Sequence, residues 1–133
     1  MAPEDNNKLV YVVEDDSEQL YVMRILLSDA GYTVVTETDA DKVLDGVQAL
    51  QPDIILLDVM LPSQRGLDGF ELCSRIRKLP GFEDTVIVII SAIAEGAGPM
   101  RERMMDQVGA DDFIVKPYDP PALVSRLHAL TAR

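Results

Sequence analysis

The stretch Asp53-Ile54-Ile55-Leu56-Leu57-Asp58-Val59-Met60-Leu61-Pro62 decides how the rest of the chain is arranged. Its four consecutive large aliphatic residues, 54–57, predict a strand buried on both faces, as in a parallel sheet covered by helices. Asp58 follows this strand directly, and Pro62 stops any continuation as a ladder strand. Because ligands of open α/β sheets bind beyond the carboxyl ends of the strands, Asp58 lies where a functional group is expected. Taken alone, such an aspartate more commonly just marks the end of a strand.

Composition narrows the class of protein. The 133 residues suffice for one domain with a buried core, and the 47% hydrophobic and 26% charged fractions are typical of a globular protein. The net charge of −11 argues against nucleic acid or an anionic membrane surface as a direct partner. No apolar stretch approaches the roughly 18 residues of a membrane span, and the polar N-terminus does not resemble a signal peptide. The single cysteine, Cys73, fits a reducing compartment, so we expect a cytoplasmic location.

Apolar segments of strand length alternate with segments of helical pattern along the chain. We expect a disordered lead-in over residues 1–7 and one domain over residues 8–133. The predicted strands are Lys8–Val13, Tyr32–Thr36, Ile54–Leu57, Thr85–Ile90 and Asp112–Val115. The predicted helices begin at Asp16 or Ser17, Asp39, Gly69, Met100 and Asp119, and the fourth of them ends at Val108. This alternation requires right-handed crossovers, and therefore a parallel sheet with helices on both faces.

Polar groups stand at the ends of four predicted strands. Glu14-Asp15-Asp16 follows the first strand, Asp58 the third, Ser91 the fourth and Lys116 the fifth. These ends meet at one edge of a doubly wound sheet, and clustered carboxylates need a counter-charge because each raises the pKa of its neighbours. Oxygen ligands without a nearby His or Cys favour Mg²⁺, which commonly bridges to a phosphoryl group. A lysine and a hydroxyl suit phosphate oxygens, so the sequence predicts phosphoryl chemistry at this edge.

Together these motifs are similar to those of the receiver domain of two-component response regulators. The resemblance covers Lys8 to Leu130 and rests on Glu14-Asp15-Asp16, Asp58-Val59-Met60-Leu61-Pro62, Asp68-Gly69, Ser91-Ala92, Gly109-Ala110-Asp111-Asp112 and Lys116-Pro117. Each motif alone is weak, but all of them in this order are highly specific. The resemblance implies a flavodoxin-like, doubly wound, five-stranded parallel sheet of order 2-1-3-4-5 with five helices in a single domain, in agreement with the alternation of segments.

The resemblance also implies how phosphate and metal are bound. Asp58 would accept a phosphoryl group from a phosphohistidine of a sensor histidine kinase or phosphotransfer protein, giving an acyl phosphate. Asp15, Asp58 and the backbone carbonyl of Met60 would ligate Mg²⁺, and Glu14 would hold a coordinated water. The chain would assist its own Mg²⁺-dependent phosphorylation and dephosphorylation, but we expect a signalling switch rather than an enzyme.

The remaining implied roles concern switching and partners. Lys116 would pair with phosphoryl oxygens, Ser91 would donate a hydrogen bond to one of them, and Phe113 would be the aromatic side chain that moves inward. This is a two-state switch that is biased by contacts to the phosphoryl group. The last two strands and helices would then present a surface to a downstream protein or to an output domain absent from this chain. The last two helices are also where a homodimer would form.

Two segments are longer than the family pattern. Ser63 to Leu67 separates Pro62 from Asp68-Gly69, which adds roughly three residues to the usual loop, and Glu95 to Pro99 also lies in a long segment. These insertions would alter partner choice or make the fourth-helix region mobile. Neutral drift of surface loops explains them equally well.

Other functions remain open at this point. A phosphate-independent adaptor or dimerisation module would have the same fold, although it would not need the complete set of acid pocket, acceptor, hydroxyl and lysine. A small Mg²⁺-dependent phosphatase, a nucleotide-binding enzyme and a flavin protein are disfavoured, because the first strand is followed by an acidic turn rather than a glycine-rich phosphate loop.

Overall fold

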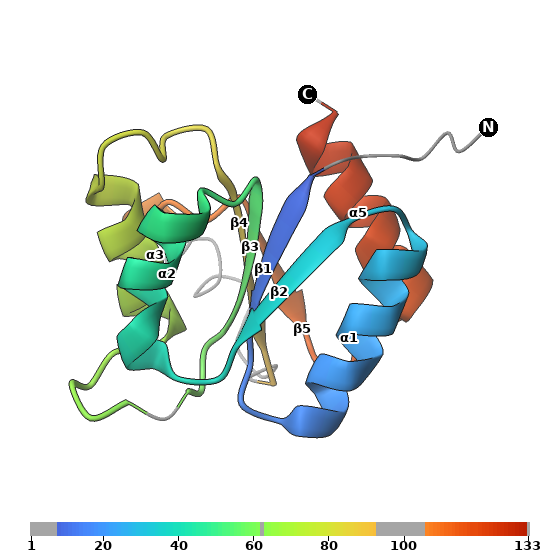
Figure 1. Ribbon diagram of the computed structural model, residues 1–133, viewed down its shortest axis with the longest axis horizontal. Helices are drawn as coiled ribbons and strands as arrows, with labels where there is room; N and C mark the ends of the chain where they lie inside the picture. The colour runs from blue at the N-terminus through green and yellow to red at the C-terminus, as the bar shows by residue number, and fades with distance from the viewer. Residues whose placement is uncertain (1–7, 62, 93–105, 133) are drawn as a thin grey trace.

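Five parallel strands form a central sheet with helices on both faces in the computed structural model (Figure 1). The structure describes residues 8–61, 63–92 and 106–132. Its elements are β1 (Leu9–Val13), α1 (Ser17–Asp29), β2 (Thr33–Glu37), the 3₁₀ helix η1 (Ala40–Lys42), α2 (Val43–Leu50), β3 (Ile54–Asp58), α3 (Gly69–Lys78), β4 (Val86–Ser91), β5 (Asp112–Val115) and α5 (Pro120–Thr131). The strand order β2-β1-β3-β4-β5 confirms the predicted doubly wound topology.

Most predicted elements lie within a residue of their observed bounds, and the differences have local causes. Asp58 and Ser91 are the last residues of β3 and β4, because pairing with the neighbouring strands continues one residue further than predicted. The predicted second helix begins as η1 before it continues as α2. Of the predicted fourth helix, residues 106–108 are helical. The rest of that helix, the long segment Glu95–Pro99 and the lead-in of residues 1–7 lie outside the described residues.

The hydrophobic core consists of two layers, one on each face of the sheet. Every residue of β3 and β4 is buried, as the predicted two-sided burial requires. Leu57 and Ile89 point to the layer under α2 and α3, whereas Leu56 and Val88 point to the layer under α1 and α5. Each fully buried side chain of this size contributes roughly 1.5–3 kcal/mol, so the central strands are a stable base for the loops at their ends.

Aspartates begin the helical segments that follow the strands. The carboxylates of Asp16, Asp39, Asp68 and Asp119 accept hydrogen bonds from backbone N–H groups in the first turns of α1, η1, α3 and α5. Such a cap is worth about 1 kcal/mol of helix stability. Because each cap lies close to the carboxyl end of a strand, the four caps also fix the loops at that edge of the sheet.

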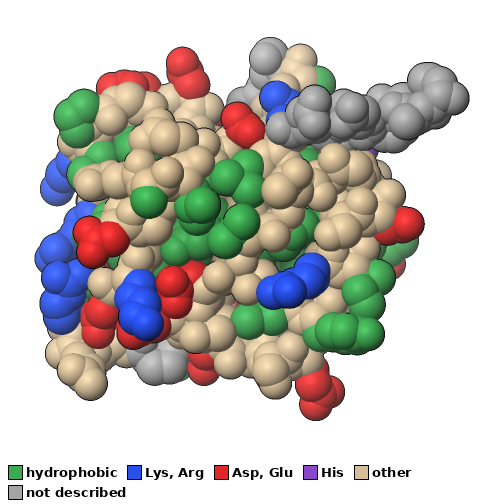
Figure 2. Space-filling view, viewed as in Figure 1, with side chains coloured by type: hydrophobic (Ala, Val, Ile, Leu, Met, Phe, Trp, Pro, Cys, Tyr) green, Lys and Arg blue, Asp and Glu red, His purple; other side chains and the backbone are tan. Residues whose placement is uncertain are grey.

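In the view of Figure 1, the edge strand β2 lies between the helices α2 and α3 on one side and α1 and α5 on the other. Figure 2 shows hydrophobic side chains gathered in the middle of this face, between the helical layers, and Lys and Arg side chains along its left margin over the α2 and α3 layer. The last turn of α3 carries Arg75, Arg77 and Lys78, which complement the negative end of the helix dipole. No helix in the described part of the chain is long and apolar enough to cross a membrane.

Candidate functional site

Residues from three strand ends meet at the carboxyl edge of the sheet. Lys116, directly after β5, places its Nζ 2.6 Å from Asp58 Oδ2 at the end of β3 and 3.0 Å from Glu14 Oε1, directly after β1. The side chains of Asp58 and Glu14 are each 8% exposed, and that of Lys116 is 17% exposed. One ammonium group therefore bridges two nearly buried carboxylates.

The electrostatics of this triad follow from burial and proximity. Burial raises the pKa of Glu14, and the hydrogen bond from Lys116 only partly opposes this effect. Burial also acts to lower the pKa of Lys116, but its hydrogen bonds to Asp58 and Glu14 outweigh that effect and raise its pKa above the usual value. Lys116 is therefore charged at neutral pH. The triad thus contains two acidic side chains but only one basic side chain, so its formal charge is negative.

Backbone contacts hold Asp58 in place. Its Oδ1 accepts a hydrogen bond of 2.8 Å from the backbone N–H of Met60. The Val59 N–H donates to the Ile90 carbonyl at 3.1 Å, and the Val59 carbonyl accepts from the Gly69 N–H at 3.2 Å. A Cβ at Gly69 would lie 2.6 Å from the Asp58 carbonyl oxygen, so the start of α3 packs against the acceptor strand only without a side chain there.

Ser91 lies in β4, the strand next to β3, and Phe113 lies in β5, the edge strand beyond β4. Ser91, at the end of β4, is fully buried, and its carbonyl accepts a hydrogen bond of 2.7 Å from the Lys116 N–H. It is one residue beyond Ile90, the register partner of Asp58. Phe113 in β5 is 5% exposed and stacks on Phe70 of α3 with ring centroids 6.2 Å apart. In this structure the predicted switch aromatic therefore already lies inside the core.

Asp15, a predicted metal ligand, lies outside the triad. Its side chain is exposed next to Glu14. Across residues 8–61, 63–92 and 106–132, no three His, Cys, Asp or Glu side chains are clustered closely enough to hold a metal ion. The donor chemistry nevertheless fits Mg²⁺, because the oxygen atoms of Glu14, Asp15, Asp58 and the Met60 carbonyl are hard ligands beside surplus negative charge.

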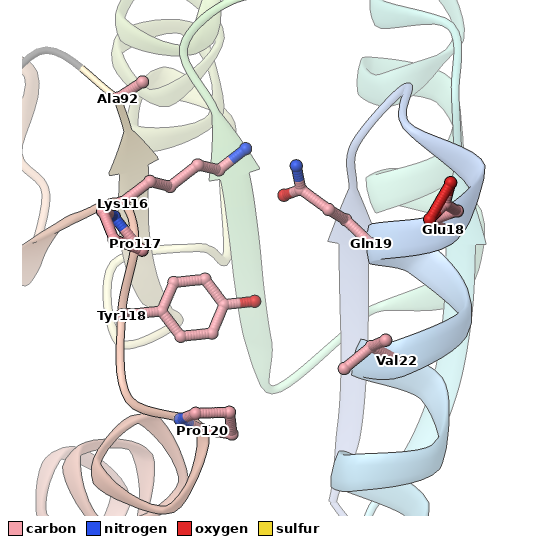
Figure 3. Close-up of a pocket in the computed structure, with 8 residues that line it drawn as sticks. All are labelled: Glu18, Gln19, Val22, Ala92, Lys116, Pro117, Tyr118 and Pro120. Carbon is pink, nitrogen blue, oxygen red and sulfur yellow. The ribbon is translucent and has the colours of Figure 1, made fainter.

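A pocket of about 590 Å³ opens beside the triad between α1 and the start of α5 (Figure 3). Lys116 lies at one end with its ammonium group directed towards the end of β3, and the Tyr118 ring extends across the pocket towards α1. The amide of Gln19 in α1 faces the same space. The sequence pattern did not predict that Gln19 and Tyr118 line a pocket. The one indication for Tyr118 was its position two residues after Lys116, close to a strand end.

The comparisons with known proteins agree with this geometry. The family model of the response regulator receiver domain matches residues 10–128. The chain is 34% identical over 131 residues to the probable transcriptional regulator ycf27 of Cyanophora paradoxa, covering 98% of this chain and 51% of that protein. It is 38% identical over 125 residues to the transcriptional regulatory protein CseB of Streptomyces coelicolor, covering 93% and 49%. The chain thus spans about half the length of these curated relatives.

Solved structures of response regulators and of a chemotaxis protein are also similar to this chain. A putative response regulator from Chloroflexus aurantiacus superimposes with a TM-score of 0.84 at 28% identity, covering 96% of this chain and 100% of that one. The chemotaxis protein CheY4 of Vibrio cholerae superimposes with a TM-score of 0.82 at 27% identity, covering 93% and 98%. The family match, the strand order and the similarity over nearly the whole chain lead to one conclusion: this chain belongs to the response regulator receiver domain family.

Proposed function

We propose that this domain is a phosphorylation-controlled switch in which Asp58 accepts a phosphoryl group from a sensor histidine kinase or a phosphotransfer protein. The observation that carries the proposal is the triad. Asp58 ends a central strand, is held by the Met60 N–H, and faces an ammonium group that is charged at neutral pH. These are the features of an anionic nucleophile beside a cation that binds phosphoryl oxygens.

The transfer is a displacement at phosphorus. A carboxylate oxygen of Asp58 forms the new P–O bond while the P–N bond of the donor phosphohistidine breaks, and the electron pair of that bond leaves with the imidazole. Asp58 becomes an acyl phosphate. Lys116 then exchanges its contact with the carboxylate for contacts with the phosphoryl oxygens, so that one cation stabilises both states of the site.

Mg²⁺ is the cofactor we assign to this step, with Glu14, Asp15, Asp58 and the carbonyl of Met60 as the residues that would hold it. When bound, it supplies positive charge that neutralises the phosphoryl oxygens. Two acidic side chains that share one ammonium group favour a divalent cation, because a second positive charge would balance both of them.

Ser91 and Phe113 would report the chemistry to the surface. The Ser91 hydroxyl donates to a phosphoryl oxygen, and the resulting shift of β4 stabilises the inward position of Phe113 against Phe70. A bistable core of this kind converts a small local change into a surface change around β5 and α5. The partner there is a downstream protein or an output domain outside this chain. A homodimer through the last two helices stays a prediction.

Intact mass after incubation with acetyl phosphate tests the proposal. Wild type should gain a single phosphoryl adduct that requires Mg²⁺, and Asp58→Asn should gain none. Asp53→Asn is the matched control, because Asp53 precedes β3 and its Oδ2 accepts from the Leu9 N–H at the other end of the sheet. Absence of an adduct in wild type under all conditions would contradict the proposal and favour the phosphate-independent adaptor.

A further inference from the structure

The loop between β3 and α3 is attached to η1 through a single aspartate. Asp41 Oδ1 accepts a hydrogen bond of 2.6 Å from Ser63 Oγ, and Asp41 Oδ2 accepts one of 2.9 Å from the Gln64 N–H. Arg65 adds an ion pair, with its Nε 3.6 Å from Asp41 Oδ1. In Figure 1 this loop runs beside the turn that leads into α2. We call these contacts the Asp41 anchor.

Ser63 also organises the loop itself. Its Oγ accepts hydrogen bonds from the N–H groups of Arg65 at 3.2 Å and Leu67 at 2.9 Å. The side chain of Leu67 is 3% exposed and belongs to the core under α2 and α3. The Ser63 hydroxyl therefore joins the exposed part of the loop both to η1 and to the buried Leu67.

The anchored residues are those that lengthen this loop beyond the family pattern, and they follow closely on the acceptor strand. The Val59–Gly69 hydrogen bond closes the base of the loop, and Met60, whose N–H binds Asp58, lies just inside it. Without an anchor, the added residues would have to be ordered whenever the Met60 carbonyl engaged a ligand, at about 1–2 kcal/mol per ordered residue.

We propose that the Asp41 anchor is a positioning device, in which Asp41 and Ser63 pre-order the β3–α3 loop so that the Met60 carbonyl is ready to bind Mg²⁺. This inference rests on the proposed function and concerns residues that touch neither the metal nor the phosphoryl group. Because the loop is already ordered in the folded protein, Mg²⁺ binding loses less conformational entropy, and the affinity for the metal is higher. The pKa of Asp41 lies below its usual value, mainly because of the Ser63 hydrogen bond, so the anchor is intact at neutral pH.

The test measures binding of Mg²⁺ alone by titration calorimetry, together with amide hydrogen exchange. In Ser63→Ala and Asp41→Ala, exchange at Gln64 and Leu67 should become faster and the Kd for Mg²⁺ should rise about 3- to 10-fold, less than for direct supports of ligands. Because both changes break the same anchor, the double variant should be no worse than either single one. At saturating Mg²⁺ the rate of phosphorylation by acetyl phosphate should be unchanged.

Two controls separate positioning from charge and general stability. Ser63→Thr keeps the hydroxyl and should retain wild-type affinity. Asp45→Ala removes the same charge from an exposed position of α2 and should change the Kd by less than about 2-fold, because exposed charges are screened. Faster exchange with an unchanged Kd would overturn the inference and leave the proposed function standing. A wild-type protein that binds no Mg²⁺ would overturn the proposed function and this inference with it.

Discussion

Removing the charge of Lys116 should destabilise the domain strongly at neutral pH. Lys116→Met keeps most of the aliphatic stem but leaves Glu14 and Asp58 without their shared cation at 3.0 and 2.6 Å. At an effective dielectric constant of about 20, each contact has a gross attraction of about 5.5–6.5 kcal/mol, which the desolvation of three charges largely offsets. Breaking a buried pair costs about 3–5 kcal/mol, and because Lys116 is partly exposed we expect about 3 kcal/mol.

Urea unfolding followed by circular dichroism measures this loss. With a denaturant dependence of about 1.5 kcal/mol/M, the midpoint should fall by about 2 M at about pH 7. The pKa of Glu14 is already raised and rises further without the lysine, so its unfavourable contribution grows as pH rises above the ordinary value of 4.5. The deficit of the variant should therefore shrink as pH falls towards that value. Millimolar Mg²⁺ should stabilise the variant more than wild type, because the cation replaces the missing charge.

Lys78→Met is the matched control, because it removes one positive charge from an exposed position at the end of α3. It should cost less than about 1 kcal/mol. If Lys116→Met cost no more than Lys78→Met, or if its deficit did not depend on pH, the reasoning about the buried triad would be refuted.

Three further predictions follow from the same region and the core. Glu14→Gln should raise the free energy of unfolding by roughly 1 kcal/mol at about pH 7, because burial disfavours the ionised form of Glu14. This gain should vanish below the ordinary pKa of 4.5, and an unchanged urea midpoint at about pH 7 would contradict the prediction. Gly69→Ala should lower the thermal midpoint through a loss of about 1–3 kcal/mol, since its Cβ would meet the Asp58 carbonyl, whereas Gly81→Ala, whose Cβ has open space, should show only the strain of its positive φ. Burial raises the pKa of Cys73 to about 12, so a thiol reagent at about pH 8 should label it only after urea unfolding; rapid labelling of the native protein would disprove this.

The fold was largely predictable because its signals are local. Uninterrupted apolar segments marked β3 and β4, and aspartate caps marked the starts of the helices. The start of α2 differed, because Asp39 caps the N–H of Asp41 two residues later and the chain first makes a 3₁₀ turn. No pattern of hydrophobic residues distinguishes that turn from a regular first helical turn.

The sequence could indicate the position of a site residue only where that residue ends a strand or directly follows one. Topology alone brings Glu14, Asp58 and Lys116 together, which the sequence pattern anticipated, but it does not specify which pairs make contact. The Asp41 anchor joins η1 to the β3–α3 loop through residues 22 positions apart, and no local signal reveals it. The same holds for Arg77, whose guanidinium donates to backbone carbonyls before β4 and β5 and to the carboxylate of Asp111.

The central claim is that Asp58 carries the phosphoryl group. The most direct measurement treats the acetyl phosphate-labelled protein with borohydride, which reduces an acyl phosphate to an alcohol, and then locates the change by tandem mass spectrometry. We expect homoserine at position 58, only in samples that received both Mg²⁺ and acetyl phosphate, with Asp15 and Asp53 unmodified. Reduction at any other aspartate, or none in a protein that gained a phosphoryl adduct, would contradict the account.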